Sequence, residues 1–250
     1  MPPEASRSCG VRGDGVSRRL IGCWAVLIAV ALVAAGCGEL GIGGVQPAPG
    51  SPTRAQVQGL LDRVRVVADR ARPGGYQRGC GKGEGCVFGS AWSDDHDGPD
   101  GHDGCDTRND VLAAQLTQVR FRAGTRDCVV VAGVLIDPYT GDRVEFRKEE
   151  AGRVQIDHVY PLAAAWDLGA SNWPPDKRIR FANDTVTNLL ATTTAANQAK
   201  SDGTPADWLP PRAENHCFYA GKYLTVAVAY DLPVTAADNA VLHDIARDCP

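Results

Sequence analysis

Five polar residues between positions 157 and 200 are of the types that a metal-dependent hydrolytic site uses. Asp157 and His158 are adjacent, and Asn188, Asn197 and Lys200 follow in the same stretch of the chain. Carboxylate and amide oxygens are ligands that Mg²⁺ prefers, and a His side chain with an ordinary pKa of about 6.5 can accept a proton at neutral pH. Together these residue types predict a site that hydrolyses a phosphodiester bond with one divalent metal ion.

Each of the five residues has a predicted role. His158 is the general base that activates water, and Asp157 and Asn197 hold the metal ion, expected to be Mg²⁺ with Mn²⁺ as an alternative. Asn188 is expected to hydrogen-bond to backbone near His158 and so fix the imidazole ring. Lys200 is expected to donate to the phosphate. The predicted catalytic residues are therefore His158, Asn188 and Lys200.

Basic residues elsewhere are candidates for binding the substrate. Arg178 and Arg180 precede the Asn188 segment and could contact phosphate together with Lys200. Arg108 lies in the first turn of an expected helix, where it could either bind phosphate or form a structural ion pair. The sequence does not decide between these two roles of Arg108.

Two expected elements position the five residues. Residues 154–159 read as a short strand that carries the Asp-His pair at its C-terminal end. Thr194 is predicted to cap a helix that presents Asn197 and Lys200 on one face, since they are three residues apart. Residues 169–180, which contain a Pro-Pro pair, are expected to be a loop between these elements.

Other segments have the periodicity of helices or strands that would support the site. They are an amphipathic helix over residues 54–72, a helix capped by Asp106 or Thr107, a β-hairpin of residues 128–136 and 143–146, a helical turn over residues 162–168, and a C-terminal helix that begins at Thr235. The hairpin is expected to have no chemistry of its own.

The beginning of the chain is typical of a lipoprotein signal peptide. Four Arg residues precede an apolar run over residues 20–35, which ends in Val-Ala-Ala-Gly before Cys37. We expect residues 1–36 to be removed, Cys37 to be lipidated, and the Gly- and Pro-rich residues 37–53 to form a flexible tether. An uncleaved membrane anchor and an ordinary cleavage with a free Cys37 are the alternatives.

The cysteine count agrees with a location outside the cytoplasm. Of nine cysteines, six remain once the leader and Cys37 are set aside, and an even number in an oxidising compartment predicts three disulfides. Six cysteines allow 15 pairings. Closeness in sequence favours Cys80 with Cys86, Cys105 with Cys128, and Cys217 with Cys249. A zinc site is the competing interpretation, but the sequence has no C-x-x-C pair.

The charge of the chain excludes a protein that coats nucleic acid through a global positive field. The whole sequence has 26 basic and 30 acidic residues, and without the four Arg and two acidic residues of the leader these become 22 and 28, a net charge of −6. Any polyanionic substrate must therefore be held by a local basic patch and a metal ion.

The Asp-rich loop at residues 94–103 resembles a calcium loop in composition but lacks EF-hand spacing, so we interpret it as a solvated acidic loop.

Several motifs together resemble a known family. They are IDHVYPLAAAW, FANDTVTNLLAT, NQAKSDGTPADWLPP and FGSAWSDDHDGPDGHDGCDTRNDVL. In combination they resemble secreted HNH, or His-Me finger, endonucleases related to the C-terminal nuclease domain of GmrSD-type restriction enzymes. The resemblance runs from about Tyr76 to Cys249. It implies a ββα-metal core in which His158 activates water, Asp157 and Asn197 contact the metal, and Asn188 positions the site.

The predicted protein is thus a single α+β domain over residues 54–250, with a ββα-metal core motif at residues 154–208, additional helices, a supporting β-hairpin and disulfides. The expected function is that of an extracytoplasmic metal-dependent endonuclease acting on DNA, with RNA as an alternative substrate. It would be lipid-anchored to the outer face of the membrane or secreted, and no protein partner is predicted. The alternative is a non-catalytic, disulfide-rich surface lipoprotein that binds nucleic acid or a solute.

Overall fold

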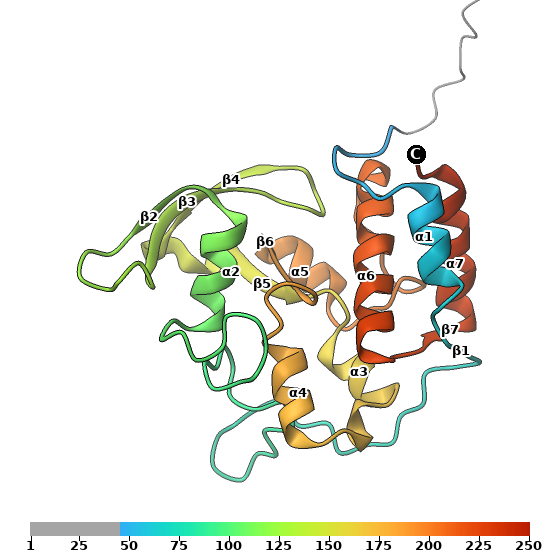
Figure 1. Cartoon of the computed structure of the whole chain (residues 1–250), viewed down its shortest axis with the longest axis horizontal. Coiled ribbons are helices and arrows are strands. Elements are labelled where there is room, and N and C mark those ends of the chain that lie inside the picture. Colours follow the sequence, from blue (N-terminus) through green and yellow to red (C-terminus); the bar gives the residue numbers. More distant parts are fainter. Residues whose placement is uncertain (1–45) are drawn as a thin grey trace, which may run out of the picture. The chain divides into compact units, whose positions relative to one another are not determined.

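The computed structural model of the chain describes residues 46–250 (Figure 1). The predicted signal peptide, the lipidation site at Cys37 and most of the predicted tether lie outside the described residues. Within residues 46–250, no helix combines the length and the apolar character that crossing a membrane requires.

The described part of the chain mixes helices with three small sheets. The helices are α1 (Arg54–Leu61), α2 (Thr107–Gln115), α3 (Leu162–Asp167), α4 (Pro175–Ala182), α5 (Thr194–Lys200), α6 (His216–Tyr230) and α7 (Ala236–Asp248), with short 3₁₀ turns at Lys148–Arg153, Ala170–Asn172 and Ala213–Asn215. The strands are β1 (Val66–Val67), β2 (Thr117–Phe121), β3 (Val130–Ile136), β4 (Arg143–Arg147), β5 (Val154–His158), β6 (Leu189–Thr193) and β7 (Val234–Thr235). This agrees with the predicted α+β class.

The central unit is the antiparallel pair of β5 and β6, followed directly by α5. Val154 lies opposite Thr193 and His158 opposite Leu189. Because side chains alternate along a strand, Val154 and Ile156 point to one face of β5, where they join a buried cluster with residues of α2 and β3. The other face of the strand is covered by α5.

A three-stranded sheet and a helical layer support this unit. The sheet has the order β2-β3-β4, so the predicted hairpin of β3 and β4 exists but gains a third strand, β2, that was not predicted. Helices α1, α6 and α7 pack side by side (Figure 1). Thr53, Asp106, Thr193 and Thr235 cap their helices with side-chain oxygens, which satisfy backbone N–H groups of the first turn.

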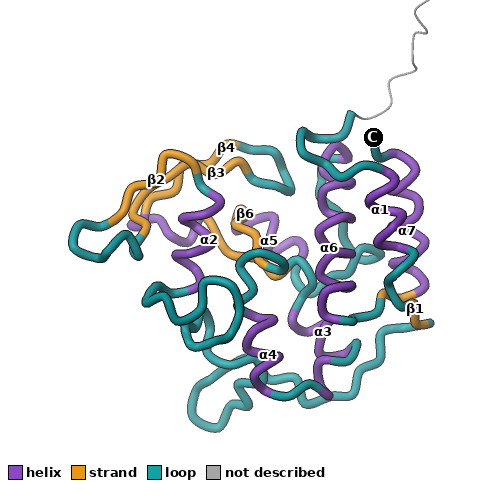
Figure 2. The backbone as a smooth tube through the Cα atoms, in the orientation of Figure 1, coloured by secondary structure: helices purple, strands orange, loops and turns teal. Residues whose placement is uncertain are grey.

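Three disulfides staple the domain, as predicted. They join Cys80 to Cys86, Cys105 to Cys128, and Cys217 to Cys249, the pairing that closeness in sequence favours. The segment between β1 and α2 is almost entirely loop (Figure 2), and the first disulfide lies within it. A long loop of this kind forms few regular backbone hydrogen bonds of its own, so it needs cross-links to hold its conformation.

Three local predictions were wrong. The helix expected over residues 54–72 ends at Leu61, because Val66 and Val67 pair in parallel with β7 instead. The loop expected at residues 169–180 contains helix α4, which begins at Pro175; a proline fits the first helical turn because its missing N–H would have no partner there. Thr193, not Thr194, caps α5, with its hydroxyl accepting from the Ala196 N–H at 3.3 Å.

The last residues of the predicted tether are packed against the domain. The Ala48 N–H donates to the Glu214 carbonyl at 2.7 Å, and the Arg54 N–H donates to the Pro250 carbonyl at 2.7 Å. The packed part of the chain therefore begins before residue 54, where the sequence placed the boundary.

Candidate active site

The alternation of β5 sends Asp157 and His158 to opposite faces of the strand. Asp157 and Gln155 face α5, where they contact Lys200 and Asn197 respectively. His158 lies on the face of Val154 and Ile156. Both side chains nevertheless line one cavity, because they lie at the end of the strand.

The Asp157 carboxylate is 4% exposed and is held by two donors from different elements. Lys200 Nζ lies 3.0 Å from Oδ1, and the Tyr139 hydroxyl donates to Oδ2 at 2.6 Å. Burial raises the pKa of Asp157, while Lys200 and the Tyr139 hydrogen bond act against this rise. The orientation and charge of the carboxylate thus depend on both donors.

Lys200, which was predicted to donate to the phosphate, is buried and does not line the cavity. The residue is 1% exposed, and besides Asp157 its ammonium group donates to the His158 carbonyl at 2.8 Å. Burial lowers its pKa, and the attraction of Asp157 opposes that change. The buried ammonium is thus hydrogen-bonded to the Asp157 carboxylate and to the backbone at the end of β5.

The His158 imidazole has a defined tautomer. Nε2 lies 2.9 Å from the Ala182 carbonyl, and a carbonyl can only accept, so Nε2 carries the proton and Nδ1 has a free lone pair. Burial lowers the pKa of His158 to about 3, with Arg78 and Lys200 acting in the same direction and the Ala182 hydrogen bond acting against it. The ring is therefore neutral at pH 7, and its Nδ1 lone pair is free. Trp92 lies parallel to it, with ring centroids 5.9 Å apart.

Asn188 is fully buried and ties together the backbone around His158. Its Oδ1 accepts from the Tyr160 N–H at 2.9 Å, and its own carbonyl accepts from the Val159 N–H at 2.8 Å. Its Nδ2 faces the Phe181 carbonyl at 3.4 Å, next to the Ala182 carbonyl that orients His158. These contacts fit the positioning role predicted for Asn188.

Asn197 lines the same cavity from α5. Its Nδ2 donates to Gln155 Oε1 at 2.8 Å, which holds the amide by its nitrogen. The amide oxygen has no hydrogen-bond partner among the described residues. Gln155, which the sequence did not single out, thus orients Asn197 so that an oxygen ligand is available.

The cavity next to these residues has a volume of about 610 Å³, within the usual range for a small-ligand site. Besides Asp157, His158 and Asn197 it is lined by Tyr76, Arg78, Trp92, Ile156, Pro161, Leu162, Ala163, Ser201 and Asp202. The aromatic residues and Arg78 come from the stapled loop before α2, to which the sequence assigned no chemistry.

The three arginines predicted to bind substrate do not line this cavity. Arg108 donates to the carbonyls of Ala151 and Val154 at 3.1 and 2.8 Å, so it has a structural role. Arg178 donates to the Val87 and Trp173 carbonyls. Arg180 is exposed on α4. Arg178 and Arg180 lie on helix α4 rather than in the expected loop, and Arg180 remains accessible to solvent.

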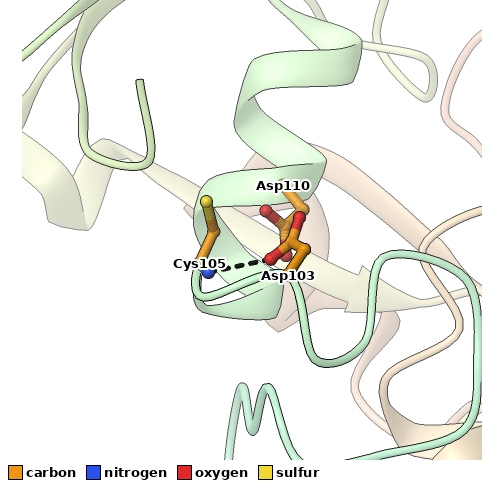
Figure 3. Close-up of side chains that lie close together, drawn as sticks. All are labelled: Asp103, Cys105 and Asp110. Atoms are coloured by element: carbon orange, nitrogen blue, oxygen red, sulfur yellow. Dashed lines mark hydrogen bonds between the residues drawn. The ribbon is translucent and has the colours of Figure 1, made fainter. Parts of the chain in front are cut away.

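A second group of metal-ligating residue types lies at the start of α2. Asp103, Cys105 and Asp110 have ligand atoms within 4.8 Å of one another (Figure 3). Cys105 is bonded to Cys128, however, and Asp103 accepts from the Cys105 N–H at 2.8 Å. A disulfide sulfur is not a thiolate ligand. Asp110 lies in the first turn of α2, and burial, with a smaller contribution from the neighbouring carboxylates, raises its pKa to about 7.

Two buried tyrosines allow a test of the contact to Asp157. We expect Tyr139→Phe to lower the free energy of unfolding by about 1.5–3 kcal/mol, because a hydrogen bond to a carboxylate is lost. Tyr219→Phe is the matched control: its ring packs against Tyr139, and its buried hydroxyl has no partner in residues 46–250, so we expect no loss. Urea unfolding of both variants measures the difference, and equal effects would contradict the assignment.

The fold and the side chains define an α+β domain with a His, Asp and Asn cluster at the junction of two antiparallel strands and a helix. The chain belongs to the family described as GmrSD restriction endonucleases, C-terminal domain, which matches residues 106–245. An uncharacterized secreted protein of Arthroderma benhamiae is 36% identical over 146 residues, which are 58% of this chain and 68% of that protein. No solved structure matches the chain.

Proposed function

We propose that the protein is a metal-dependent endonuclease of the HNH type that acts outside the cytoplasm on DNA, with RNA as an alternative substrate. The observation that carries the proposal is the neutral His158, whose Nε2 is fixed by a backbone carbonyl and which shares a cavity with Asp157 and Asn197. The succession of β5, β6 and α5 has the order of a ββα-metal core, and the chain's family is one of restriction endonuclease domains.

The residues present fit a divalent cation. Each oxygen of the Asp157 carboxylate accepts one hydrogen bond, Oδ1 from Lys200 and Oδ2 from Tyr139. Since a carboxylate has about four lone-pair positions, positions remain for a metal ion. The Asn197 oxygen is without a partner among the described residues and lines the same cavity. Two hard oxygen donors suit Mg²⁺ or Mn²⁺. When bound, the ion would stabilise negative charge on the phosphate.

The protein's own residues would then act as follows. His158 takes a proton from water at Nδ1, since Nε2 donates to Ala182 and cannot accept. The Asn188 side chain contacts the backbone on each side of that hydrogen bond: it accepts from the Tyr160 N–H, near His158, and donates to the Phe181 carbonyl, next to Ala182. Lys200 acts through Asp157 and the His158 carbonyl rather than on the substrate. This assignment keeps the five residues predicted from sequence and changes the role of one.

The proposed location rests on two observations. The relative from Arthroderma benhamiae is named a secreted protein, and the chain has three disulfides, which persist in oxidising compartments. Lipidation of Cys37 is part of the proposal but lies outside the described residues. The alternative, a non-catalytic surface protein that binds nucleic acid or a solute, would have the same fold and location without turnover.

Incubation of the purified full-length chain with supercoiled plasmid tests the proposed function. We expect nicked and then linear or degraded plasmid with 5–10 mM Mg²⁺ or Mn²⁺, on the order of the concentrations at which weakly held divalent cations saturate their sites, and no cleavage in EDTA. Restored cleavage after the metal is added back would show that EDTA acts on the ion. Binding of DNA without cleavage under every metal condition would favour the non-catalytic alternative.

A further inference from the structure

Arg78 differs from every other charged residue that lines the cavity. Asp157 is paired with Lys200 at 3.0 Å, and Asp202 is paired with Arg70 at 2.9 Å. Arg78 has no carboxylate within ion-pair distance among the described residues. Arg70 divides its charge between Asp202 and Asp167, at 2.9 and 2.8 Å. Arg78 is thus the one charged lining residue without an ion-pair partner in the described part of the chain.

The Arg78 side chain is held in place but keeps free donors. Its Nη1 donates to the Gly89 carbonyl at 2.8 Å, and its other guanidinium N–H groups have no acceptor in the described part of the chain. The side chain is half-buried, and burial lowers its pKa. A charge that is partly removed from water without a counter-ion is costly, so the free donors favour an anion in the cavity.

The loop around Arg78 is stiffened on both sides. The Cys86 N–H donates to the Gly79 carbonyl at 2.9 Å and the Val87 N–H to the Gln77 carbonyl at 3.1 Å, and the Cys80–Cys86 disulfide closes the same turn. Arg178 of α4 donates to the Val87 carbonyl at 2.6 Å. Helix α4 also supplies the carbonyl that orients His158, so one helix fixes both Arg78's loop and the imidazole.

We propose that Arg78 binds a phosphate group of the nucleic-acid substrate in the cavity beside His158, and that the disulfide-closed segment of residues 77–89 is the element that positions it. This inference rests on the proposed function. The family match begins at residue 106 and therefore does not assign the segment. A guanidinium suits the task because its planar fork can donate two parallel hydrogen bonds to phosphate oxygens.

Binding of a fluorescent single-stranded oligonucleotide to the full-length chain in EDTA tests this inference without cleavage. We expect Arg78→Ala to weaken binding about tenfold, the effect of losing a charged phosphate contact of roughly 1.4 kcal/mol. We also expect the slope of log K against log salt to fall by about 0.7, one phosphate contact on a single strand. Lys82→Ala is the matched control, because it removes the same charge from the same loop. Lys82 is exposed and does not line the cavity.

The outcomes separate this inference from the proposed function. Wild-type affinity in Arg78→Ala, or an equal loss in Lys82→Ala, would overturn the role of Arg78 even if the protein cleaves plasmid. Tight binding that depends on Arg78 without any cleavage would support the inference and reject the nuclease. If Arg78→Ala lowers the thermal unfolding midpoint, Arg78→Lys replaces it: we expect about a threefold loss, because Lys lacks the fork, and unchanged affinity would again overturn the proposal.

Discussion

Replacing His158 with Ala is expected to reduce plasmid cleavage by about 100- to 10,000-fold, the range for loss of a general base. The reason is geometric: Nε2 is committed to the Ala182 carbonyl at 2.9 Å, so Nδ1 is the one nitrogen free to take a proton from water. Because the pKa of His158 is lowered to about 3, protonation of this residue should not limit activity between pH 5 and pH 8, a range well above it. Initial rates at saturating Mg²⁺ or Mn²⁺ measure both effects.

A second His offers the control for this experiment. His243 lies on α7 and does not line the cavity, so His243→Ala should retain the wild-type rate. The circular dichroism spectrum and the unfolding midpoint of His158→Ala should show that the variant is folded. A folded His158→Ala protein that still cleaves at the wild-type rate would remove His158 from the catalytic site and with it the proposed mechanism.

Replacing Lys200 with Met is expected to lower the free energy of unfolding by about 3–5 kcal/mol, because the substitution leaves a carboxylate buried without its counter-ion. The Lys200 and Asp157 side chains are 0% and 4% exposed and lie 3.0 Å apart. The Tyr139 hydrogen bond remains in the variant and offsets only part of the loss. Urea unfolding gives the free energy, and metal binding measured by calorimetry should weaken as well, since Asp157 loses a group that orients it.

The double variant Asp157→Asn/Lys200→Met makes this prediction specific to the buried pair. We expect it to recover much of the lost stability while remaining inactive, because the uncompensated charge is gone together with the proposed metal ligand. Arg153→Met breaks the exposed pair with Glu150, whose side chains are more than half exposed, and should cost less than about 1 kcal/mol. Equal losses in Lys200→Met and Arg153→Met would contradict the burial argument.

Much of the local structure followed from the sequence. Apolar periodicity and capping residues predict the strand that carries Asp157 and His158, the helix that begins at Thr235, and the hairpin of β3 and β4. They also predict a helix cap at Asp106 or Thr107, of which the structure has Asp106. These features depend on contacts between residues close in sequence. The disulfide pairing was favoured for the same reason, since the structure joins the cysteines that are nearest along the chain.

The errors fall where distant segments compete with local preference. Val66 and Val67 lie at positions that suit a helix, but they pair with β7, more than 160 residues away in the chain by the register of Val66 with Val234. In the sequence, Arg178 and Arg180 follow two prolines, which predict a loop in which their side chains are free to bind phosphate. Helix α4 instead directs Arg178 to backbone carbonyls at Val87 and Trp173.

The sequence by itself determined the candidate residues Asp157, His158, Asn188 and Asn197 and the order of the elements that carry them. Only the tertiary structure decided what those residues contact. Tyr139 reaches Asp157 from a turn expected to be a support, and Lys200 is buried beneath the strand rather than in the cavity. The physical reason is that side-chain types show which chemistry is available, whereas burial and hydrogen-bond partners depend on segments that meet only when the chain has folded.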